Sequence, residues 1–274
     1  WHIGHRQLNV GCHLVRGSFM KAFFAALKGL FALFAFASPA GAQSGSEFSD
    51  AERAEIREMV GTYILENPEI IEEALIELQR RARQRESEAM MSAINANADL
   101  LYNDARDPSI GPDDAPIVIV EFMDYKCGYC RIASQWVSEA RQAYGDQIRF
   151  VFKEYPILGE ESRVAARAAL AVLRQGEDVY WRFHTAMVQS SGPLPSGRIE
   201  NFARLAGADV AQMQEDMDDP EIQTHLEQVY ALGRAIGAEG TPFFIINGRP
   251  VPGANREMLD ELLAAELSRV RRGG

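Results

Sequence analysis

The feature that most constrains this chain is a pair of cysteines placed directly after an apolar run. Residues 117–123 read IVIVEFM, and DYKCGYC follows, with Cys127 and Cys130 separated by two residues. A run that is β-branched and apolar at nearly every position is typical of a central strand buried on both faces. The residues after Cys127 have helical spacing. The cysteine pair is therefore expected where a buried strand ends and a helix begins.

Four roles are open to such a pair, and three of them fit this sequence poorly. A structural zinc site needs four ligands, and beyond residue 42 the chain offers only His184 and His225 besides the two cysteines. Haem attachment requires a histidine where Arg131 stands. A disulfide loop across two residues constrains little of the unfolded chain. The pattern favours a catalytic dithiol that needs no cofactor and no metal.

Cys127 is expected to be the reactive sulfur. At the start of a helix, a thiolate faces unpaired backbone N–H groups and the positive end of the helix dipole. That dipole contributes up to about 2 kcal/mol, which lowers a thiol pKa from about 8.5 by a little over one pH unit. A deeper depression requires direct hydrogen bonds to sulfur, including one from Cys130. We predict that Cys127 attacks the substrate and that Cys130 displaces it from the mixed disulfide.

The first 42 residues are expected to be absent from the working protein. Residues 1–19 have no readable pattern and are interpreted as upstream translation. Residues 20–42, MKAFFAALKGLFALFAFASPAGA, have a basic start, an apolar run and a small-residue end, which predicts a signal peptide cleaved after Ala42. The alternative is a membrane anchor, but the apolar run is short for one. Cleavage removes four bases and no acid, so the net charge moves from −11 to −15. Such a charge argues against nucleic acid as a partner.

Residues 43–105 are expected to form an N-terminal helical arm. Ser49 caps a first helix, and Asn67-Pro68 starts a second. The second helix has one narrow apolar seam, and the polar stretch 79–88 is expected to be a solvated connector. The seam consists of Ile71, Leu75, Leu78 and Ala82. So narrow a seam cannot build a core. The arm either packs on the main domain or, as we favour, associates between chains.

Residues 106–274 are expected to form one α/β domain. RDPSIGPDDAP at 106–116 has the composition of a linker. After it the elements follow the order βαβ, a block of helices over about 157–238, and then ββα. The first unit requires a crossover connection between two parallel strands.

Three further residues are candidates for the site. Pro242 stands just before an apolar strand, where it is expected to open the strand, with a cis bond or as an ordinary trans turn residue. Glu121 and Lys153 are charges inside apolar strands. Burial without a partner is costly, so the two are expected to pair beneath the cysteines and to move the proton that thiol exchange requires. The alternative is that either faces solvent at an edge.

The stretches IVIVEFMDYKCGYC, FVFKEYPILG and GTPFFIINGRPVPGA together resemble the DsbA family of thioredoxin-fold thiol–disulfide oxidoreductases, over roughly residues 115–271. The resemblance implies a thioredoxin fold with an inserted helical domain. It also implies a cis-proline loop at Thr241-Pro242, a buried acid at Glu121 and a matching base at Lys153.

Within that family, ENPEIIEEALIELQRR and the Cys-Gly-Tyr-Cys centre look most like the suppressor-of-copper-sensitivity protein C group. This likeness implies oligomerisation through the arm, with a trimer favoured, and a membrane thiol reductase that keeps the dithiol reduced. Pure oxidases of the family typically carry Cys-Pro-His-Cys, and valine before the cis-proline. Gly128, Tyr129 and Thr241 stand at those positions here, which implies a milder redox potential.

The expected function is a periplasmic thiol–disulfide oxidoreductase that acts on unfolded or misoxidised exported proteins, with isomerase or reductase activity favoured. Two alternatives stay open. One is a dithiol oxidase of the DsbA type. The other is a non-catalytic copper-binding protein that uses the two thiols, with Met90 and Met91 as further candidate ligands.

Overall fold

The computed structural model describes residues 48–273, so the expected signal peptide lies outside the described residues. Contacts divide the chain into two units that meet between Tyr63 and Ile64. None of the described helices combines the length and the apolar character that a membrane crossing needs.

Helix α1 (Asp50–Glu66) begins with the capping that the sequence predicted. Glu52 N–H donates to the Ser49 hydroxyl at 3.3 Å, and Ser49 N–H donates to the Glu52 carboxylate at 2.8 Å. This reciprocal pair satisfies two N–H groups that the helix itself leaves unpaired. No residue of α1 is buried, and apolar side chains such as Met59 and Tyr63 are exposed.

Helix α2 (Glu69–Ala96) is continuous and includes the polar stretch 79–88. Glu77 forms ion pairs of 2.7 Å with both Arg80 and Arg81, one turn further along the helix. Such i,i+3 and i,i+4 pairs stabilise an exposed helix by a few tenths of a kcal/mol each. The solvated connector is therefore helical, and nearly all of α2 before Met90 lies in solvent.

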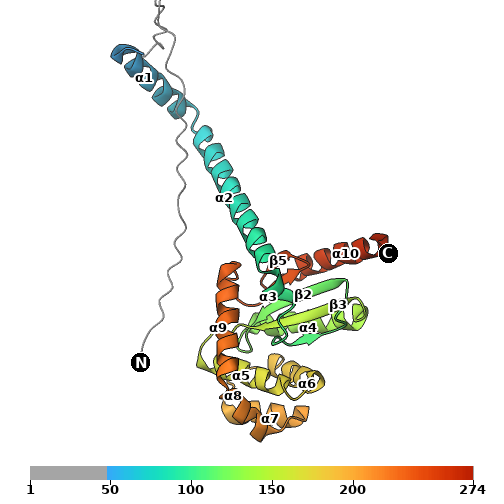
Figure 1. Cartoon of the computed structure of the whole chain (residues 1–274). Coiled ribbons are helices and arrows are strands. Elements are labelled where there is room, and N and C mark those ends of the chain that lie inside the picture. The colour runs from blue at the N-terminus through green and yellow to red at the C-terminus, as the bar shows by residue number, and fades with distance from the viewer. Residues whose placement is uncertain (1–47, 274) are drawn as a thin grey trace, which may run out of the picture. The chain divides into compact units, whose positions relative to one another are not determined.

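A five-stranded sheet forms the centre of the main domain (Figure 1). Its order is β1-β3-β2-β4-β5, with β2 and β3 parallel and the other pairs antiparallel. The strands are β1 (Ser109–Ile110), β2 (Ile117–Met123), β3 (Ile148–Glu154), β4 (Phe243–Ile246) and β5 (Arg249–Pro252). Helix α4 (Gly128–Tyr144) connects the parallel pair, as the βαβ reading predicted.

Two apolar clusters cover the two faces of this sheet. One joins Ile119, Phe150 and Phe152 to α4, to the helical insertion and to the last helix, α10 (Arg256–Gly273). The other joins Val120 and Phe122 to α9 and to the end of α2. The insertion consists of α5 (Glu160–Leu173), α6 (Glu177–Val188), α7 (Ser196–Ala206), α8 (Val210–Met217) and α9 (Pro220–Ala235). Phe183 and Met187 belong to its core, and Trp181 is partly buried against them.

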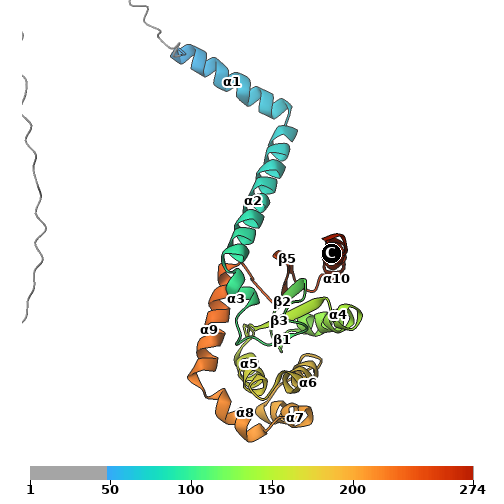
Figure 2. The same ribbon diagram turned by 45° about the vertical axis from the view of Figure 1, so that its right-hand side comes forward.

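The arm and the expected linker are less separate from the domain than the sequence suggested. Ile94 of α2 and Leu101 of α3 (Ala98–Tyr102) are fully buried against the sheet and α9, and Figure 2 shows this end of the arm beside α9. The segment 106–116 contributes the edge strand β1. The segment 90–107, called the root of the arm below, packs on the domain, while residues 69–89 remain largely exposed. Association of the arm between chains stays a prediction.

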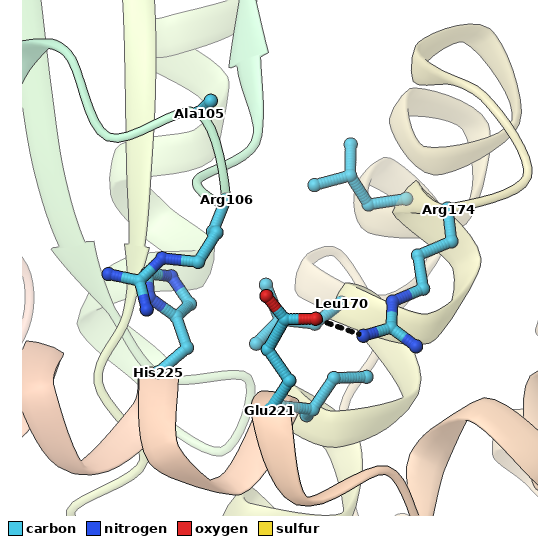
Figure 3. Close-up of a pocket in the computed structure, with 8 residues that line it drawn as sticks. Ala105, Arg106, Leu170, Arg174, Glu221 and His225 are labelled. Atoms are coloured by element: carbon cyan, nitrogen blue, oxygen red, sulfur yellow. Dashed lines mark hydrogen bonds and ion pairs between the residues drawn. The ribbon is translucent and has the colours of Figure 1, made fainter.

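A pocket of about 290 Å³ lies where this root segment meets α5 and α9 (Figure 3). Arg106 and His225 line one side, and Arg174 and Glu221 line the other. Arg174 donates to Glu221 at 3.2 Å, and Arg106 donates to Asp104 at 2.6 Å. Both arginines are therefore paired within the chain, and neither cysteine lines this pocket.

Candidate active site

The two cysteines lie at the carboxyl end of β2, where the sheet gives way to α4. Cys127 is the N-cap residue of α4, with φ −78° and ψ 115°, and its N–H donates to the Asp124 carbonyl at 2.9 Å. Both cysteines are free thiols; Cys127 is 8% exposed and Cys130 is fully buried. A reacting partner can therefore reach only the first sulfur.

The pKa of Cys127 is lowered to about 5. The largest cause is a hydrogen bond from the Cys130 thiol, and burial opposes it. The Thr241 hydroxyl and the backbone N–H groups of Cys130 and Tyr129, in the first turn of α4, lower the pKa further. The helix dipole alone lowers a thiol pKa by little more than one pH unit, so a depression of this size requires these direct hydrogen bonds to sulfur. At neutral pH the reduced protein holds Cys127 as a thiolate.

Thr241 and Pro242 close the other side of the reactive sulfur. The peptide bond between them is cis. The Cys127 thiol donates to the Thr241 carbonyl oxygen at 3.1 Å, across 114 residues of sequence. This carbonyl favours the protonated sulfur, whereas the hydroxyl of the same residue favours the thiolate. The depressed pKa shows that the donors prevail over the acceptor.

Cys130 and Glu121 lie deeper and are held in their protonated forms. Burial is the main cause that raises the pKa of Cys130 far above its usual range, with contributions from its bond to Cys127 and from the charge of Glu121. Burial and the charge of Cys127 raise the pKa of Glu121 to about 8. Glu121 is therefore close enough to both sulfurs to respond to their charge, and it titrates in the range where it can accept or return a proton.

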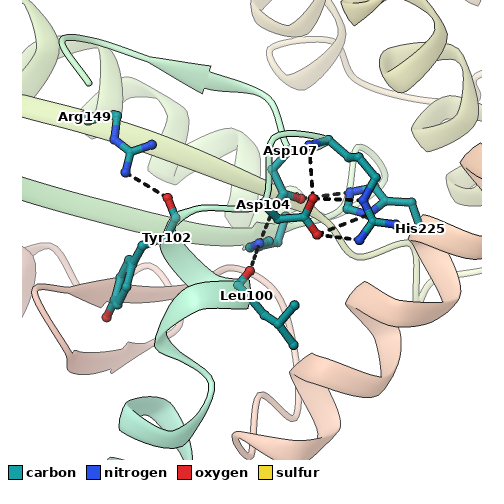
Figure 4. A network of polar contacts seen from close by, with 8 residues as sticks. Leu100, Tyr102, Asp104, Asp107, Arg149 and His225 are labelled. Atoms are coloured by element: carbon teal, nitrogen blue, oxygen red, sulfur yellow. Dashed lines mark hydrogen bonds and ion pairs between the residues drawn. The ribbon is translucent and has the colours of Figure 1, made fainter. Parts of the chain in front are cut away.

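The expected pairing of Glu121 with Lys153 is wrong. Glu121 pairs in register with Phe152, and Lys153 pairs with Phe122, so the two charged side chains project from opposite faces of the sheet. Lys153 instead donates to the Leu100 carbonyl and to the Asp107 carboxylate, both in the root of the arm (Figure 4).

Asp107 connects Lys153 to the insertion. Its second oxygen is 3.0 Å from Nε2 of His225 on α9, and all three side chains are buried. Arg149 of β3 adds a bond of 2.8 Å to the Tyr102 carbonyl (Figure 4). These contacts make Lys153 an anchor for the arm's root. The composition of 106–116 gave no sign that the neighbouring Asp107 would be its partner.

A second polar cluster next to the cysteines was missed by the sequence reading. Tyr125 precedes Cys127 by two residues, and its hydroxyl lies 3.0 Å from both Glu154 Oε1 and His184 Nδ1. The Tyr180 hydroxyl lies 3.1 Å from the same His184 nitrogen and 3.4 Å from Glu154. The cluster thus joins the cysteine loop to the end of β3 and to α6.

Burial is the first cause that shifts the pKa of all four side chains toward the uncharged form. Burial lowers the pKa of His184 to about 3, and burial raises the pKa of Glu154 well above its usual range. The signal available in the sequence was an acid directly after an apolar strand, in FVFKEY, and a histidine within an apolar helix. From the sequence, that histidine is a candidate only as a metal ligand. Among residues 48–273, no group of His, Cys, Asp and Glu side chains is arranged to hold a metal ion.

Comparison with known proteins agrees with this geometry. A family model described as the DSBA-like thioredoxin domain matches residues 118–264, more than half of the chain. The chain belongs to this family. The model of the copper resistance protein ScsC N-terminal domain matches residues 52–85, which lie in α1 and α2. The predicted fold class, a thioredoxin fold with a helical insertion and an N-terminal helical region, is confirmed.

Curated relatives match about half of this chain. The Na(+)/H(+) antiporter NhaA of Herminiimonas arsenicoxydans is 31% identical over 152 residues, which are 54% of this chain and 24% of the antiporter. The chain thus spans about a quarter of the length of the antiporters it matches. The probable disulfide bond formation protein D of Bacillus anthracis is 28% identical over 150 residues, 51% of this chain and 69% of that protein.

Solved structures extend the likeness to the arm. Proteus mirabilis ScsC in a transitional conformation is 28% identical, with 81% of this chain and all of that chain covered and a TM-score of 0.60. A thioredoxin-like oxidoreductase from Silicibacter pomeroyi DSS-3 is 38% identical over 64% of this chain and 97% of that chain, with a TM-score of 0.56. The thiol–disulfide exchange protein α-DsbA2 of Wolbachia pipientis is 28% identical over 64% and 97%, with a TM-score of 0.59.

Proposed function

We propose that this protein is an exported thiol–disulfide oxidoreductase that reduces or reshuffles disulfides in unfolded proteins. The observation that carries the proposal is the asymmetry of the two thiols. Cys127 is accessible with a pKa of about 5, whereas Cys130 is buried and protonated. A solvent-accessible thiolate attacks the substrate disulfide, whereas a buried thiol reacts only in the intramolecular step that follows.

The reaction runs in two displacements. The Cys127 thiolate attacks one sulfur of a substrate disulfide; a mixed disulfide forms, and the other substrate sulfur leaves as a thiolate that takes up a proton. The mixed disulfide carries no charge on Cys127, which lowers the pKa of Glu121, and Glu121 releases its proton to solvent. The Glu121 carboxylate then accepts the proton of Cys130, and Cys130 attacks Cys127. The second substrate sulfur leaves as a thiolate and takes up this proton from Glu121. The substrate gains two electrons and two protons, and the protein holds a Cys127–Cys130 disulfide. A membrane thiol reductase is the proposed source of the electrons that restore the dithiol.

Exposed apolar side chains lie on the two segments next to the reactive sulfur, the start of α4 and the loop after β3. Tyr129 and Ile132 on the first turns of α4 are 66% and 60% exposed, and Leu158 after β3 is 53% exposed. Leu158 is tied to the cysteine loop because its N–H donates to the Asp124 carboxylate at 3.0 Å. A surface of this kind suits clients whose own apolar residues are exposed, which are unfolded or misoxidised proteins.

The arm supports isomerase or reductase activity over simple oxidation. Ile71, Leu75 and Leu78 of α2 are each about half exposed, and α1 has no buried residue. This seam suits pairing with the arms of other copies, for which a trimer is the favoured state. An oligomer would hold several reactive centres around one client, and repeated sulfur exchange benefits from a client that stays bound.

An exported setting is supported by the likeness to a periplasmic thioredoxin-like protein from Salmonella enterica serovar Typhimurium, 27% identical over 64% of this chain and 97% of that chain, with a TM-score of 0.57. We propose the periplasm as the location of this protein.

Two assays on the full chain test the proposal. Insulin reduction reports the first displacement, and recovery of scrambled ribonuclease reports reshuffling. Activity in both is expected, and loss in both for Cys127→Ser. Fast oxidation of reduced ribonuclease without recovery of the scrambled form would instead support a dithiol oxidase.

The arm is tested with one matched pair. Leu75→Glu places a charge in the seam and is expected to give monomers in light scattering, with insulin reduction retained and reshuffling reduced. Glu73→Lys changes a charge roughly 200° around the helix and is expected to leave the assembly intact. Equal masses for both variants would contradict assembly through the seam.

Copper binding has weaker support. Met90 is partly buried and packs against the cluster formed by α9 and the sheet. Copper(I) titration with and without Cys127→Ser decides the question: tight binding in a protein that fails to reduce insulin would favour the copper-binding alternative.

A further inference from the structure

A pocket of about 390 Å³ opens beside the proline loop, on the face of the sheet away from α4. Tyr155 and Ile157 contribute from the loop after β3, and Tyr230 and Arg234 contribute from α9. Residues 237–239, which lead into β4, complete the lining. The strands β2 and β3 end, and the antiparallel β4 begins, at the same end of the sheet. The pocket therefore lies at the same end of the sheet as the cysteines.

Short covalent and hydrogen-bonded paths connect the pocket to the reactive sulfur. Ala238 precedes Thr241 by three residues, which span at most about 11 Å, and the Thr241 carbonyl is 3.1 Å from Sγ of Cys127. On the other wall, Tyr155 N–H donates to the Met123 carbonyl at 2.8 Å. These paths bring the pocket within reach of a peptide that is joined to Cys127 through its own cysteine.

The inner wall of the pocket is aromatic and held in place. The Tyr155 hydroxyl donates to the Ala238 carbonyl at 3.2 Å. Its ring lies against Gly233 of α9, where a Cβ would come within 2.8 Å of the ring, so glycine is what allows this approach. Tyr230 faces Tyr155 at 5.8 Å between ring centres, with the planes tilted by 33°, and it is 46% exposed. The wall thus consists of the buried ring of Tyr155 and the solvent-accessible ring of Tyr230.

The rim is polar. Arg234 and Glu239 are exposed, and no ion pair of either forms with another residue in 48–273. An arginine at the rim of an aromatic pocket can lie over the face of a bound ring. Opposite charges on the two sides of the rim offer no net attraction to an acidic or a basic side chain.

We propose that this pocket binds an aromatic side chain located three residues from the client's cysteine. The inference rests on the proposed function, because it states which client proteins the Cys127 centre selects. Folded proteins bury most of their aromatic side chains, so a centre that requires one nearby distinguishes an unfolded client from a folded protein with an accessible disulfide.

The test uses the full chain in its reduced form and short glycine-rich peptides with one cysteine. Each peptide carries 2-nitro-5-thiobenzoate in a mixed disulfide, and release of this group reports attack by Cys127. Phenylalanine, alanine, glutamate or lysine is placed three residues before the cysteine, and in a second set three residues after it. Hydroxyethyl disulfide, which has no side chain, normalises each protein variant.

The phenylalanine peptide of one set is expected to react about three- to tenfold faster than the alanine peptide, the range for an aromatic contact. Tyr230→Ala is expected to remove most of that difference. Leu205→Ala, which truncates an apolar residue 74% exposed on α7, is expected to keep it.

Other results separate this inference from the proposed function. Equal rates for all four peptides in both sets, with rapid reaction throughout, would overturn the pocket's role and leave the oxidoreductase intact. A preference for glutamate or lysine, or a phenylalanine preference that survives Tyr230→Ala, would also overturn it. No reaction with any peptide or with hydroxyethyl disulfide would overturn the proposed function itself.

Discussion

The dependence of Cys127 on its neighbour Cys130 can be tested by changing that neighbour in two ways. Cys130→Ala removes the donor that contributes most to the low pKa of Cys127. Cys130→Ser keeps a donor at the same place, because a hydroxyl can donate where the thiol did. Neither variant touches the backbone N–H groups or Thr241.

The magnitude follows from the kind of bond removed. A hydrogen bond to a charged group contributes about 1.5–3 kcal/mol, and about 1.4 kcal/mol corresponds to one pH unit. The wild-type pKa of about 5 is therefore expected to rise to roughly 6–7 in Cys130→Ala. Cys130→Ser is expected to stay within about half a pH unit of the wild type. Thiolate absorbance or the rate of alkylation by iodoacetamide, followed from pH 3 to pH 10, measures the midpoint.

Two outcomes would refute this account of the site. One is a wild-type midpoint near the value of an ordinary thiol, which is about 8.5. The other is a midpoint in Cys130→Ala that matches the wild type, since Cys130 would then contribute nothing to the thiolate. Cys127→Ser supplies the blank, because it removes the only accessible thiol among residues 48–273.

Four further predictions concern proton coupling and the arm's root. Glu121→Gln removes the second titrating group of the site. Its reduction potential is expected to fall by about 59 mV per pH unit below pH 5 and by about 30 mV per pH unit above pH 5, because Cys127 takes up a proton on reduction only below its pKa. A slope that stays constant up to pH 8 would contradict this. The same variant is expected to slow the release of mixed disulfides more than their formation, which quenched-flow alkylation measures, and equal slowing of both steps would contradict the proton-accepting role. Asp107→Asn is expected to lower the free energy of unfolding in urea by about 3–5 kcal/mol, because it leaves the buried Lys153 ammonium without its carboxylate, and a loss below about 1 kcal/mol would contradict the anchor. Removal of residues 43–105 is expected to unfold the domain, whereas removal of residues 43–88 is expected to leave a folded, redox-active protein.

The sequence determined much of the reactive centre because its causes are local. A buried strand, a Cys-x-x-Cys and a following helix fix Cys127 at a helix start within a dozen residues of chain. The apolar and turn patterns likewise gave β2, β3, β4 and the helical insertion. The resemblance that these stretches carry supplied the fold family, which the comparisons confirm.

The register of the sheet decided what the sequence could not. Side chains on a strand alternate between faces, so a difference of one residue in pairing moves a charge to the opposite side. The alignment of Phe122 with Lys153 separates this lysine from Glu121 and turns it toward Asp107, 46 residues away. Polar partners that are remote in sequence leave no periodic signal, which is why the bonds from Tyr125 to Glu154 and His184 were also missed. Local pattern placed the reactive sulfur; only the packed sheet determined which acid lies beside it and which base holds the arm.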